Sequence, residues 1–420
     1  MKTRGWGIAL AGLLLMVGGC DPGGAFSDSQ VVEVVAGAGE IAGGAAPNAF
    51  IDGRLVDMVA DPSGTLRVLT EGKGEAATLW TVRNGILTHV EVPDLKADYV
   101  SQLAAGPDGA LYVALWNAEG GVWQLGEDGK LTQKVGLGRA GAVRKVAADG
   151  DPLAGANIRF LHGVAVSPSN QLYFAEQRLD KTTFQLVRTA PGGKLKTVFG
   201  RDLTGLTERD WRSARAGEGF PDGVQGTFVA IERGLSTPLA VAADGTLYAA
   251  PSSGGVVKVK PDGSAYALIG NISGGGIDGP DVDHNPWEPF DDRGSAAKAE
   301  VRFRGTGSAR SGYTNTNLSL DTNGDLYVTG IRRDDELDSA FDWSGDVTDS
   351  QRTLLELSKR QRQSRDATQV LRIRPDGTFS TAAAHADASA VHGNWLYLAR
   401  AFTDDEGSDR VLVVRTAIRD

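Results

Sequence analysis

The stretch "DGPDVDHNPWEPFDD" places oxygen-bearing side chains at a spacing that suits a metal ion. Asp281, Asp283 and Asn285 stand two residues apart, and Asp292 follows eleven residues after Asp281. Calcium takes about six to eight oxygen ligands, and a loop with this spacing can fold its side chains around one ion. Pro286 stands where such loops carry the glycine of their sharp turn, so the alternative is a solvated acidic loop. The pattern predicts calcium as the one candidate cofactor.

Large aromatic side chains recur in the long, irregular segments of the chain. An exposed aromatic ring beside Asp and Glu can stack on a sugar or anchor a protein partner. The alternative is that each ring packs into a small core under its own loop. The ligand-binding candidates on this ground are Trp211, Trp287, Tyr313 and Trp343.

The first twenty residues, "MKTRGWGIALAGLLLMVGGC", combine two early positive charges with a ten-residue apolar stretch. Such a stretch is too short to span a bilayer and is typical of an export signal. The final "VGGC" resembles the lipobox of bacterial lipoproteins, whose cysteine thiol takes a diacylglyceryl group. Cys20 is the only cysteine among the 420 residues, so it has no disulfide partner within the chain. The alternative is an ordinary secretory signal with a chance cysteine.

This resemblance predicts the organisation of the N-terminus and the location of the protein. Residues 1–19 are expected to be a signal peptide, and residues 20–30 the lipidated cysteine and its tether. The protein is then exported and held to the bacterial membrane by its N-terminal lipid. It faces the periplasm or the cell exterior.

The composition excludes one large class of partner. The chain carries 53 acidic and 43 basic residues, for a net charge of -10. Nucleic-acid binders normally present a basic face, so no nucleic acid is expected. With 56 glycines the chain is expected to hold many turns rather than long helices.

A short module recurs six times: a turn, a leucine with an aromatic residue in most copies, and an apolar strand. The copies are "DPSGTLRVL", "GPDGALYVA", "SPSNQLYFA", "AADGTLYAA", "DTNGDLYVT" and "VHGNWLYLA". Gly or Asn stands at one position of every turn, and both residue types tolerate the positive φ that tight hairpins need. These positions are Gly64, Gly109, Asn170, Gly245, Gly324 and Asn394.

A second hairpin follows each of the first five copies, with Asn-Gly, Asp-Gly or Gly-Gly at its turn. The two modules together make four antiparallel strands. Six such units predict an all-β fold, a six-bladed β-propeller of four-stranded antiparallel blades. Two packed sandwiches are the alternative.

The sixth unit has only three strands and ends in "RVLVVRTAI". A free edge strand exposes unpaired amides and invites aggregation. Residues 31–37 look like the closing strand of a unit, so we expect them to pair with residues 411–418 and complete the last blade. The propeller is thus expected to span residues 31–420.

The segments "VVEVVAGAGEIAGG" and "GDPLAGANIRFLHGVAVSPSNQLYFAE" resemble the repeats of the NHL family of β-propellers. The resemblance covers about residues 31–420 and implies the propeller fold. The family contains binding scaffolds and a few enzymes. Some NHL-like lyases hold zinc with three channel histidines, and lactonase-like propellers hold calcium with acidic residues and Asn.

The start of each innermost strand of a propeller lines its central channel. Counting back from the first module puts His162 at such a position, and Asp57, His385 and Asp387 lie close to others. These four are the catalytic candidates. The alternative for His162 is a hydrogen-bonded structural residue. Of the five histidines in the chain only His162 falls squarely at a channel position and His385 lies close to one, so the sequence does not identify three zinc ligands from separate blades.

The long insertions all fall on connections that reach the same face of the disc. This argues for a binding module that recognises a protein, peptide or glycan of the cell envelope through that face. The alternative is a metal-dependent lyase or lactonase-like enzyme at the channel mouth, so enzymatic activity stays open. The chain is expected to be a monomer. The insertions are residues 137–160, 201–225, 271–315 and 331–366.

Overall fold

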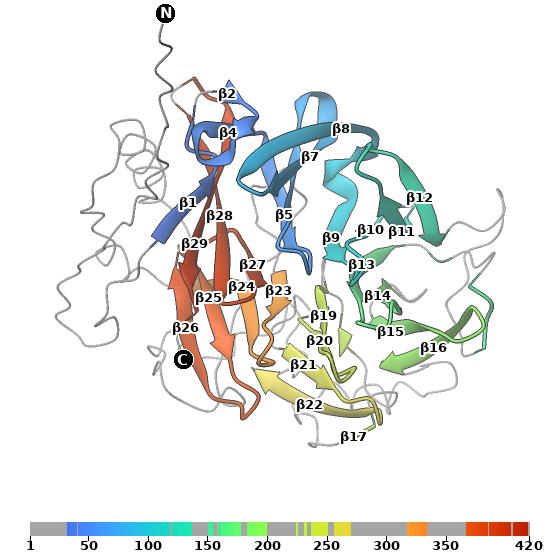
Figure 1. The fold of residues 1–420 in the computed structure, drawn as a ribbon. Coiled ribbons are helices and arrows are strands. Elements are labelled where there is room, and N and C mark those ends of the chain that lie inside the picture. The colour runs from blue at the N-terminus through green and yellow to red at the C-terminus, as the bar shows by residue number, and fades with distance from the viewer. Residues whose placement is uncertain are drawn as a thin grey trace, which may run out of the picture.

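A computed structural model places the strands in six small antiparallel sheets arranged as a ring (Figure 1). Each sheet is one blade of a six-bladed β-propeller, as the repeats predicted. Helix in the described part is limited to short 3-10 turns: η1 (Ala46–Asn48), η2 (Lys73–Glu75) and η3 (Ala97–Tyr99). The structure describes residues 32–39, 41–117, 120–136, 150–153, 158, 160–177, 183–199, 224–225, 231–232, 237–250, 256–269, 317–333, 367–384, 386–404 and 406–418.

The first three blades follow one another along the chain, each with its innermost strand first. Blade 1 consists of β5 (Arg54–Ala60), β6 (Leu66–Glu71), β7 (Ala76–Arg83) and β8 (Ile86–Lys96), with β3 (Gly44–Ala45) on its outside. Blade 2 consists of β9 (Val100–Ala105), β10 (Leu111–Leu115), β11 (Gly121–Leu125) and β12 (Leu131–Val135). Blade 3 consists of β13 (Leu161–Val166), β14 (Leu172–Gln177), β15 (Thr183–Ala190) and β16 (Lys194–Phe199), and β18 (Ile231–Glu232) pairs with β15.

The next two blades repeat this order. Blade 4 consists of β19 (Leu239–Val241), β20 (Leu247–Ala249), β21 (Val256–Val259) and β22 (Ser264–Ile269), with β17 (Val224–Gln225) outside. Blade 5 consists of β23 (Asn317–Leu320), β24 (Leu326–Arg333), β25 (Ala367–Ile373) and β26 (Phe379–Ala384). The C-terminal strands of blade 6 are β27 (Ala388–His392), β28 (Trp395–Thr403) and β29 (Asp409–Ala417).

The N-terminal strand completes blade 6, which confirms the predicted ring closure. β1 (Val32–Ala36) pairs antiparallel with β29, with Val34 opposite Val414. The Arg415 guanidinium donates two hydrogen bonds to Glu33 Oε2, at 2.9 and 2.7 Å. β4 (Ala49–Asp52) pairs with the first part of β29, and β2 (Ile41–Ala42) lies parallel to β4. Both termini of the propeller therefore meet in one blade.

Side chains of the repeated turn motif stabilise the short turns inside the blades by hydrogen bonding to the backbone. Asp61 Oδ1 accepts backbone hydrogen bonds from Ser63 at 2.9 Å and Thr65 at 3.0 Å. Gly64 and Asn170 have φ of 81° and 60°, as expected for left-handed turn positions. The same short turn, with the same kind of carboxylate contact, also joins the outer strands of several blades.

The turn of the last blade differs from the prediction. Gly393, with φ of 55°, takes the left-handed conformation there, and Asn394 has no positive φ. The turn is shorter than its counterparts, because His392 and Trp395 already pair with each other across it. The positive φ therefore falls one residue earlier in the repeat.

A hydrophobic core lies between each pair of neighbouring blades. Successive side chains of a strand point to opposite faces of its sheet, so an internal blade is apolar on both faces. Within β7, Trp80 packs toward blade 6, whereas Leu79 packs toward blade 2. Each blade is thereby fixed to both of its neighbours.

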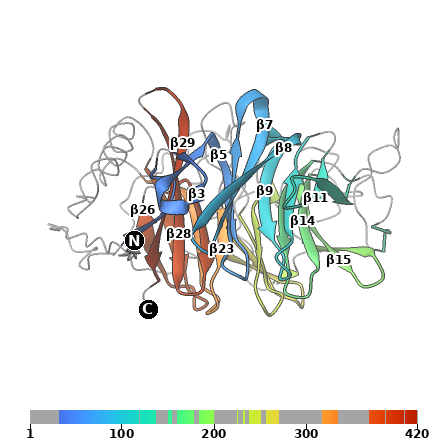
Figure 2. The same cartoon turned by 45° about the horizontal axis from the view of Figure 1, so that its top comes forward.

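The strand order gives the ring two different faces. In every blade the first strand and the third start at the same face, where the second and the fourth end (Figure 2). The blade strands before and after the long insertions end and begin at this face, here called the long-loop face. Within the 201–225 insertion, β17 pairs with the first residues of β22, near the opposite face. The short turns of each blade lie on the opposite face, here called the tight-turn face. In the described part of the chain, no helix has the length and apolar character to cross a membrane.

Candidate functional site

The centre of the ring is formed by the innermost strand of each blade: β5, β9, β13, β19, β23 and β27 (Figure 1). Polar residues interrupt these apolar strands near the long-loop face. Those buried in the strands or just before them are at most 9% exposed. They include Asp57, Ser101, Gln102, His162, Thr237, Asn317 and Asp387.

Asp57 joins three blades through its carboxylate. Oδ1 accepts hydrogen bonds from the Met58 amide at 2.8 Å and from Asn317 Nδ2, in blade 5, at 2.6 Å. Oδ2 accepts one from the Leu103 amide of blade 2 at 2.7 Å. Both carboxylate oxygens are thus engaged by donors from the propeller itself.

The protonation of Asp57 is set by two opposing effects. Burial raises the pKa of this carboxyl to about 6, because a charge is poorly solvated there. The hydrogen bonds from Leu103, Met58 and Asn317 lower the pKa and oppose part of that effect. The carboxylate therefore changes its charge near pH 6 rather than near pH 4.

Gln102 makes a second bridge, between blades 2, 3 and 4. Its Oε1 accepts hydrogen bonds from the amides of Val164 and Leu239, both at 2.9 Å. Its Nε2 donates to the Leu239 carbonyl, also at 2.9 Å. All three bonds go to backbone groups of neighbouring blades, so the side chain holds the inner strands together at this level.

The inner strands of blades 3 and 4 also touch directly. The Thr237 amide donates to the His162 carbonyl at 2.8 Å. A Cβ at Gly163 would lie 1.9 Å from the Thr237 carbonyl oxygen, so only glycine fits there. The backbones of blades 3 and 4 are therefore in direct contact at Gly163 and Thr237.

The predicted catalytic residues are distributed around the ring. His162 is buried in β13, and Asp387 Oδ2 accepts a hydrogen bond from the Ala401 amide of its own blade at 2.8 Å. The hydrogen bonds of Asp57 go to Met58, Leu103 and Asn317, and none goes to His162 or Asp387. His385 lies outside the described residues.

The other predicted sites also lie outside the part that the structure describes. Among the described residues, no group of three or more His, Cys, Asp or Glu side chains is placed to hold a metal ion. The sites outside are the lipidation residue Cys20, the calcium loop Asp281, Asp283, Asn285 and Asp292, and the aromatic residues Trp211, Trp287, Tyr313 and Trp343.

Gln102 makes the most contacts between blades among the residues of this site that the sequence analysis did not single out. Its strand reads "VSQLAA", so a long polar side chain stands within an apolar inner strand. Such a residue, fully buried, needs hydrogen-bond partners, and that requirement is the signal that marks it. Its partners lie 62 and 137 residues further along the chain, which the strand pattern alone does not predict.

No protein-family model matches this chain, and no curated protein matches it. Among solved structures, a protein of unknown function from Bacteroides thetaiotaomicron has a TM-score of 0.44 and 14% identity, over 91% of this chain and 75% of that one. The extracellular domain of a one-component system from the same organism has a TM-score of 0.35 and 9% identity, over 92% of this chain and 41% of that one. A glucose dehydrogenase-like protein from Thermus thermophilus has a TM-score of 0.29 and 15% identity, over 74% of this chain and 95% of that one. These likenesses are distant, and the fold rests on the strand pairing described above.

Proposed function

We propose that this chain is a lipid-anchored, extracytoplasmic binding module that recognises a protein, peptide or glycan through its long-loop face. The observation that carries the proposal is the antiparallel strand order, which brings the strand ends that flank the long insertions to one face. Long irregular segments cost conformational entropy, and binding residues are found disproportionately on loops that a rigid scaffold positions. All four candidate aromatic residues, Trp211, Trp287, Tyr313 and Trp343, belong to these insertions.

The centre of the ring supports the scaffold role. Asp57 and Gln102 direct their hydrogen bonds to backbone and side-chain groups of neighbouring blades. A scaffold fixed in this way presents its loops with a smaller entropy cost on binding. Recognition is then left to the loops rather than to the channel.

The proposed anchor sits next to the propeller in the sequence. Cys20 precedes the start of β1 at Val32 by twelve residues, and β1 belongs to blade 6. Two or three acyl chains on the cysteine would hold the protein stably at a membrane surface. The resemblance of the repeats to the NHL family agrees with a binding scaffold and does not select its ligand.

A metal-dependent lyase or lactonase-like enzyme is the second candidate, and one observation favours it. The pKa of Asp57 is raised to about 6, and such shifts of buried carboxyls are frequent at catalytic sites. The reaction would take place at the channel mouth, with Asp57, His162, His385 and Asp387 as the candidate groups. Zinc or calcium would supply the Lewis acid for that chemistry.

Binding measurements on the chain from residue 21 to residue 420 test the first function. The protein is probed with a glycan array and with solubilised envelope proteins, beside a variant with all four candidate aromatics changed to alanine. Binding should fall at least tenfold in that variant and stay unchanged in Tyr266→Ala, which alters a ring in β22 near the tight-turn face. Equal binding by all three proteins would contradict the proposal.

The His162→Ala variant separates the two functions. A binding module keeps its ligand affinity when this channel residue is changed. An enzyme of the second kind loses its bound metal and its turnover together, and mass spectrometry of the purified protein measures the metal directly. Loss of both in His162→Ala would replace the binding module with the enzyme.

A further inference from the structure

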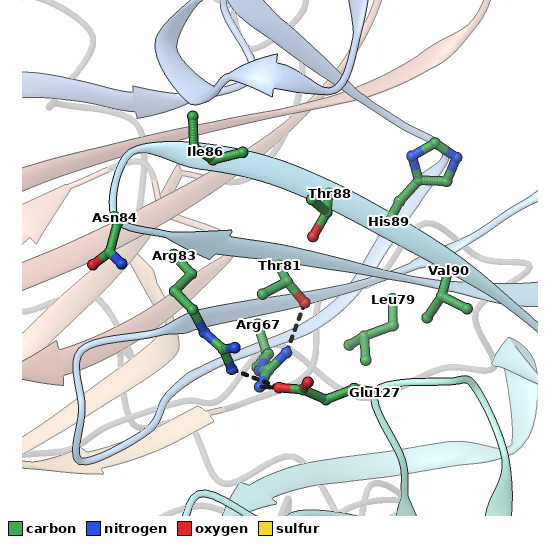
Figure 3. Close-up of a pocket in the computed structure, with 10 residues that line it drawn as sticks. All are labelled: Arg67, Leu79, Thr81, Arg83, Asn84, Ile86, Thr88, His89, Val90 and Glu127. Atoms are coloured by element: carbon green, nitrogen blue, oxygen red, sulfur yellow. Dashed lines mark hydrogen bonds and ion pairs between the residues drawn. The ribbon is translucent and has the colours of Figure 1, made fainter.

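A cleft of about 360 Å³ opens between blades 1 and 2, away from the channel (Figure 3). One wall is blade 1, where β7 and β8 contribute most of the lining and β6 contributes Arg67. The other is the turn between β11 and β12 of blade 2, which carries Glu127. Both of these hairpins turn at the tight-turn face, so the cleft lies on the opposite side of the ring from the long loops.

Strand pairing lines up the side chains that face blade 2. Thr81 of β7 lies opposite Arg67 of β6 on one side and Thr88 of β8 on the other. Two residues further along β7, Arg83 lies opposite Ile86 of β8. The wall therefore carries two guanidinium groups and two hydroxyls, with an aliphatic side chain at its edge.

Arg67 is an unusual residue for this position because its side chain is only 6% exposed. It donates one hydrogen bond to Thr81 Oγ1 at 2.8 Å and one to Glu127 Oε1 at 3.0 Å. Among the described residues its Nε has no hydrogen-bond partner. A buried guanidinium needs an anion, and here the anion comes from another blade.

Glu127 lies between the two arginines and is itself mostly in solvent. Arg83 donates to the same Oε1 at 2.5 Å, so both cations meet at one oxygen (Figure 3). The Glu127 side chain is 66% exposed, and Arg83 is 50% exposed. The pair between Arg83 and Glu127 is exposed on both sides and contributes little to stability. The buried Arg67 keeps its anion when another carboxylate takes the place of Glu127, so the exchange has a small cost.

We propose that Arg67 and Arg83 form a receptor for the carboxylate of a small organic ligand, and that Glu127 occupies this receptor when the ligand is absent. Two guanidinium groups around one carboxylate give charge-assisted hydrogen bonds in a fixed geometry. Glu127 acts as an internal competitor, because it comes from a turn at the cleft mouth and can leave without unfolding a strand. A ligand that binds therefore replaces an ion pair rather than creating a new one.

The rest of the lining indicates what the carboxylate is attached to. The hydroxyls of Thr81 and Thr88 can donate hydrogen bonds to a polar ligand or accept them from it. Leu79, Val90 and the half-exposed Ile86 offer an apolar surface beside them. His89 points away from the arginines and packs against Trp80, with ring centroids 4.7 Å apart and the rings tilted by 37°. A carboxylate on an apolar side chain and one on a sugar both fit this lining.

Calorimetric titration of the chain from residue 21 to residue 420 tests the proposal with three probes. N-acetyl-leucine carries an apolar group, glucuronate carries hydroxyls, and N-acetyl-leucinamide lacks the charge. Glu127→Gln removes the internal competitor and should bind at least one of the two carboxylates at least tenfold more tightly than the unmodified protein. The amide should not bind. Tighter binding of N-acetyl-leucine or of glucuronate identifies the source of the carboxylate.

Two variants provide the controls. Asp128→Asn makes the same change of charge in the same turn, but Asp128 pairs with Lys130 and contacts neither arginine, so its affinities should stay unchanged. Adding Arg83→Gln to Glu127→Gln should cancel the gain, and Arg83 is exposed enough for the protein to stay folded. If Glu127→Gln binds the carboxylates no better than Asp128→Asn, the three residues form only a clamp between blades and the proposal fails.

Discussion

Asp57 and Asn317 stand 260 residues apart in the sequence and are joined across the centre of the ring by a hydrogen bond of 2.6 Å. Asp57 lies on the inner strand of blade 1 and Asn317 on that of blade 5, so the bond joins two blades that are separated in the ring by blade 6. The Asn317 amide also reaches the Met58 carbonyl at 3.3 Å. The propeller is thus fixed at its centre as well as at its ring closure.

Removing the donor should therefore destabilise the whole ring. We expect Asn317→Ala to lower the free energy of unfolding by about 1–3 kcal/mol at pH 8, because the charged acceptor on Asp57 loses a buried partner. Urea denaturation measures the effect. Asn323→Ala is the matched control in the same blade, because Asn323 is exposed in a turn, and it should change stability by less than about 0.5 kcal/mol. Equal stability of the two variants would contradict a central role for the bond.

The raised pKa of Asp57 predicts how stability depends on pH. In the folded protein this pKa is about 6, above the unfolded value of 3.8, so the folded state binds the proton more tightly. The contribution of Asp57 to stability is complete below pH 3.8 and is lost as pH rises through 6. From pH 4 to pH 7 the loss should be about 3 kcal/mol at most.

Comparison with Asp57→Asn isolates this contribution from the other carboxyls. The variant cannot titrate at residue 57, so the unmodified protein should lose stability relative to it between pH 4 and pH 7. Urea denaturation of both proteins at each pH gives the difference. A difference that grows in favour of the unmodified protein as pH rises would mean that the hydrogen bonds outweigh the burial of the charge.

The close packing at Gly163 predicts that the contact between blades 3 and 4 does not tolerate a larger side chain at this position. A methyl group there would meet the Thr237 carbonyl oxygen at 1.9 Å, and the inner strands would have to separate. We expect Gly163→Ala to cost more than about 3 kcal/mol or to prevent folding, as severe overpacking of a rigid core does. Gly72→Ala is the control, because its methyl group would meet the Thr78 hydroxyl at 3.0 Å and the Ala76 carbonyl oxygen at 3.3 Å, both far less close than the contact at Gly163, and should cost about 1 kcal/mol or less. Circular dichroism and thermal melting of the two variants measure the contrast.

The parts of this fold that local chemistry determines were predictable from the sequence. Turn residues such as Gly64 and Asn170 mark the hairpins, because few residue types adopt positive φ. The pairing of residues near Val34 with those near Val414 was also predictable, since an unpaired last strand needs a partner. In the turn of blade 6 the same reasoning assigned the positive φ to Asn394, whereas Gly393 adopts it, because this turn is shorter than those of the other blades.

The sites between blades were harder to predict, because they depend on distances that only the assembled ring sets. His162 and Asp57 were chosen from their place in the repeat, but the repeat does not say which side chain reaches which blade. Gln102 bridges three blades, and Arg67 meets Glu127 across 60 residues. Neither contact leaves a periodic signal, so the sequence offers only the general rule that a buried polar group needs a partner.

Ring closure by β1 predicts that the propeller depends on a short N-terminal segment. Three chains that start at residues 21, 31 and 38 make the comparison, and all three end at residue 420. The first two should melt together, because residues 21–30 precede the first strand. The third lacks β1, so it loses the strand pairing with β29 and the hydrogen bonds between Arg415 and Glu33. We expect its Tm to fall by about 5–10 °C, with aggregation through the exposed edge of β29. Differential scanning calorimetry and light scattering measure the two effects. An unchanged melt of the third chain would mean that the contacts of β4 with Arg410 and Val411 hold blade 6 closed on their own.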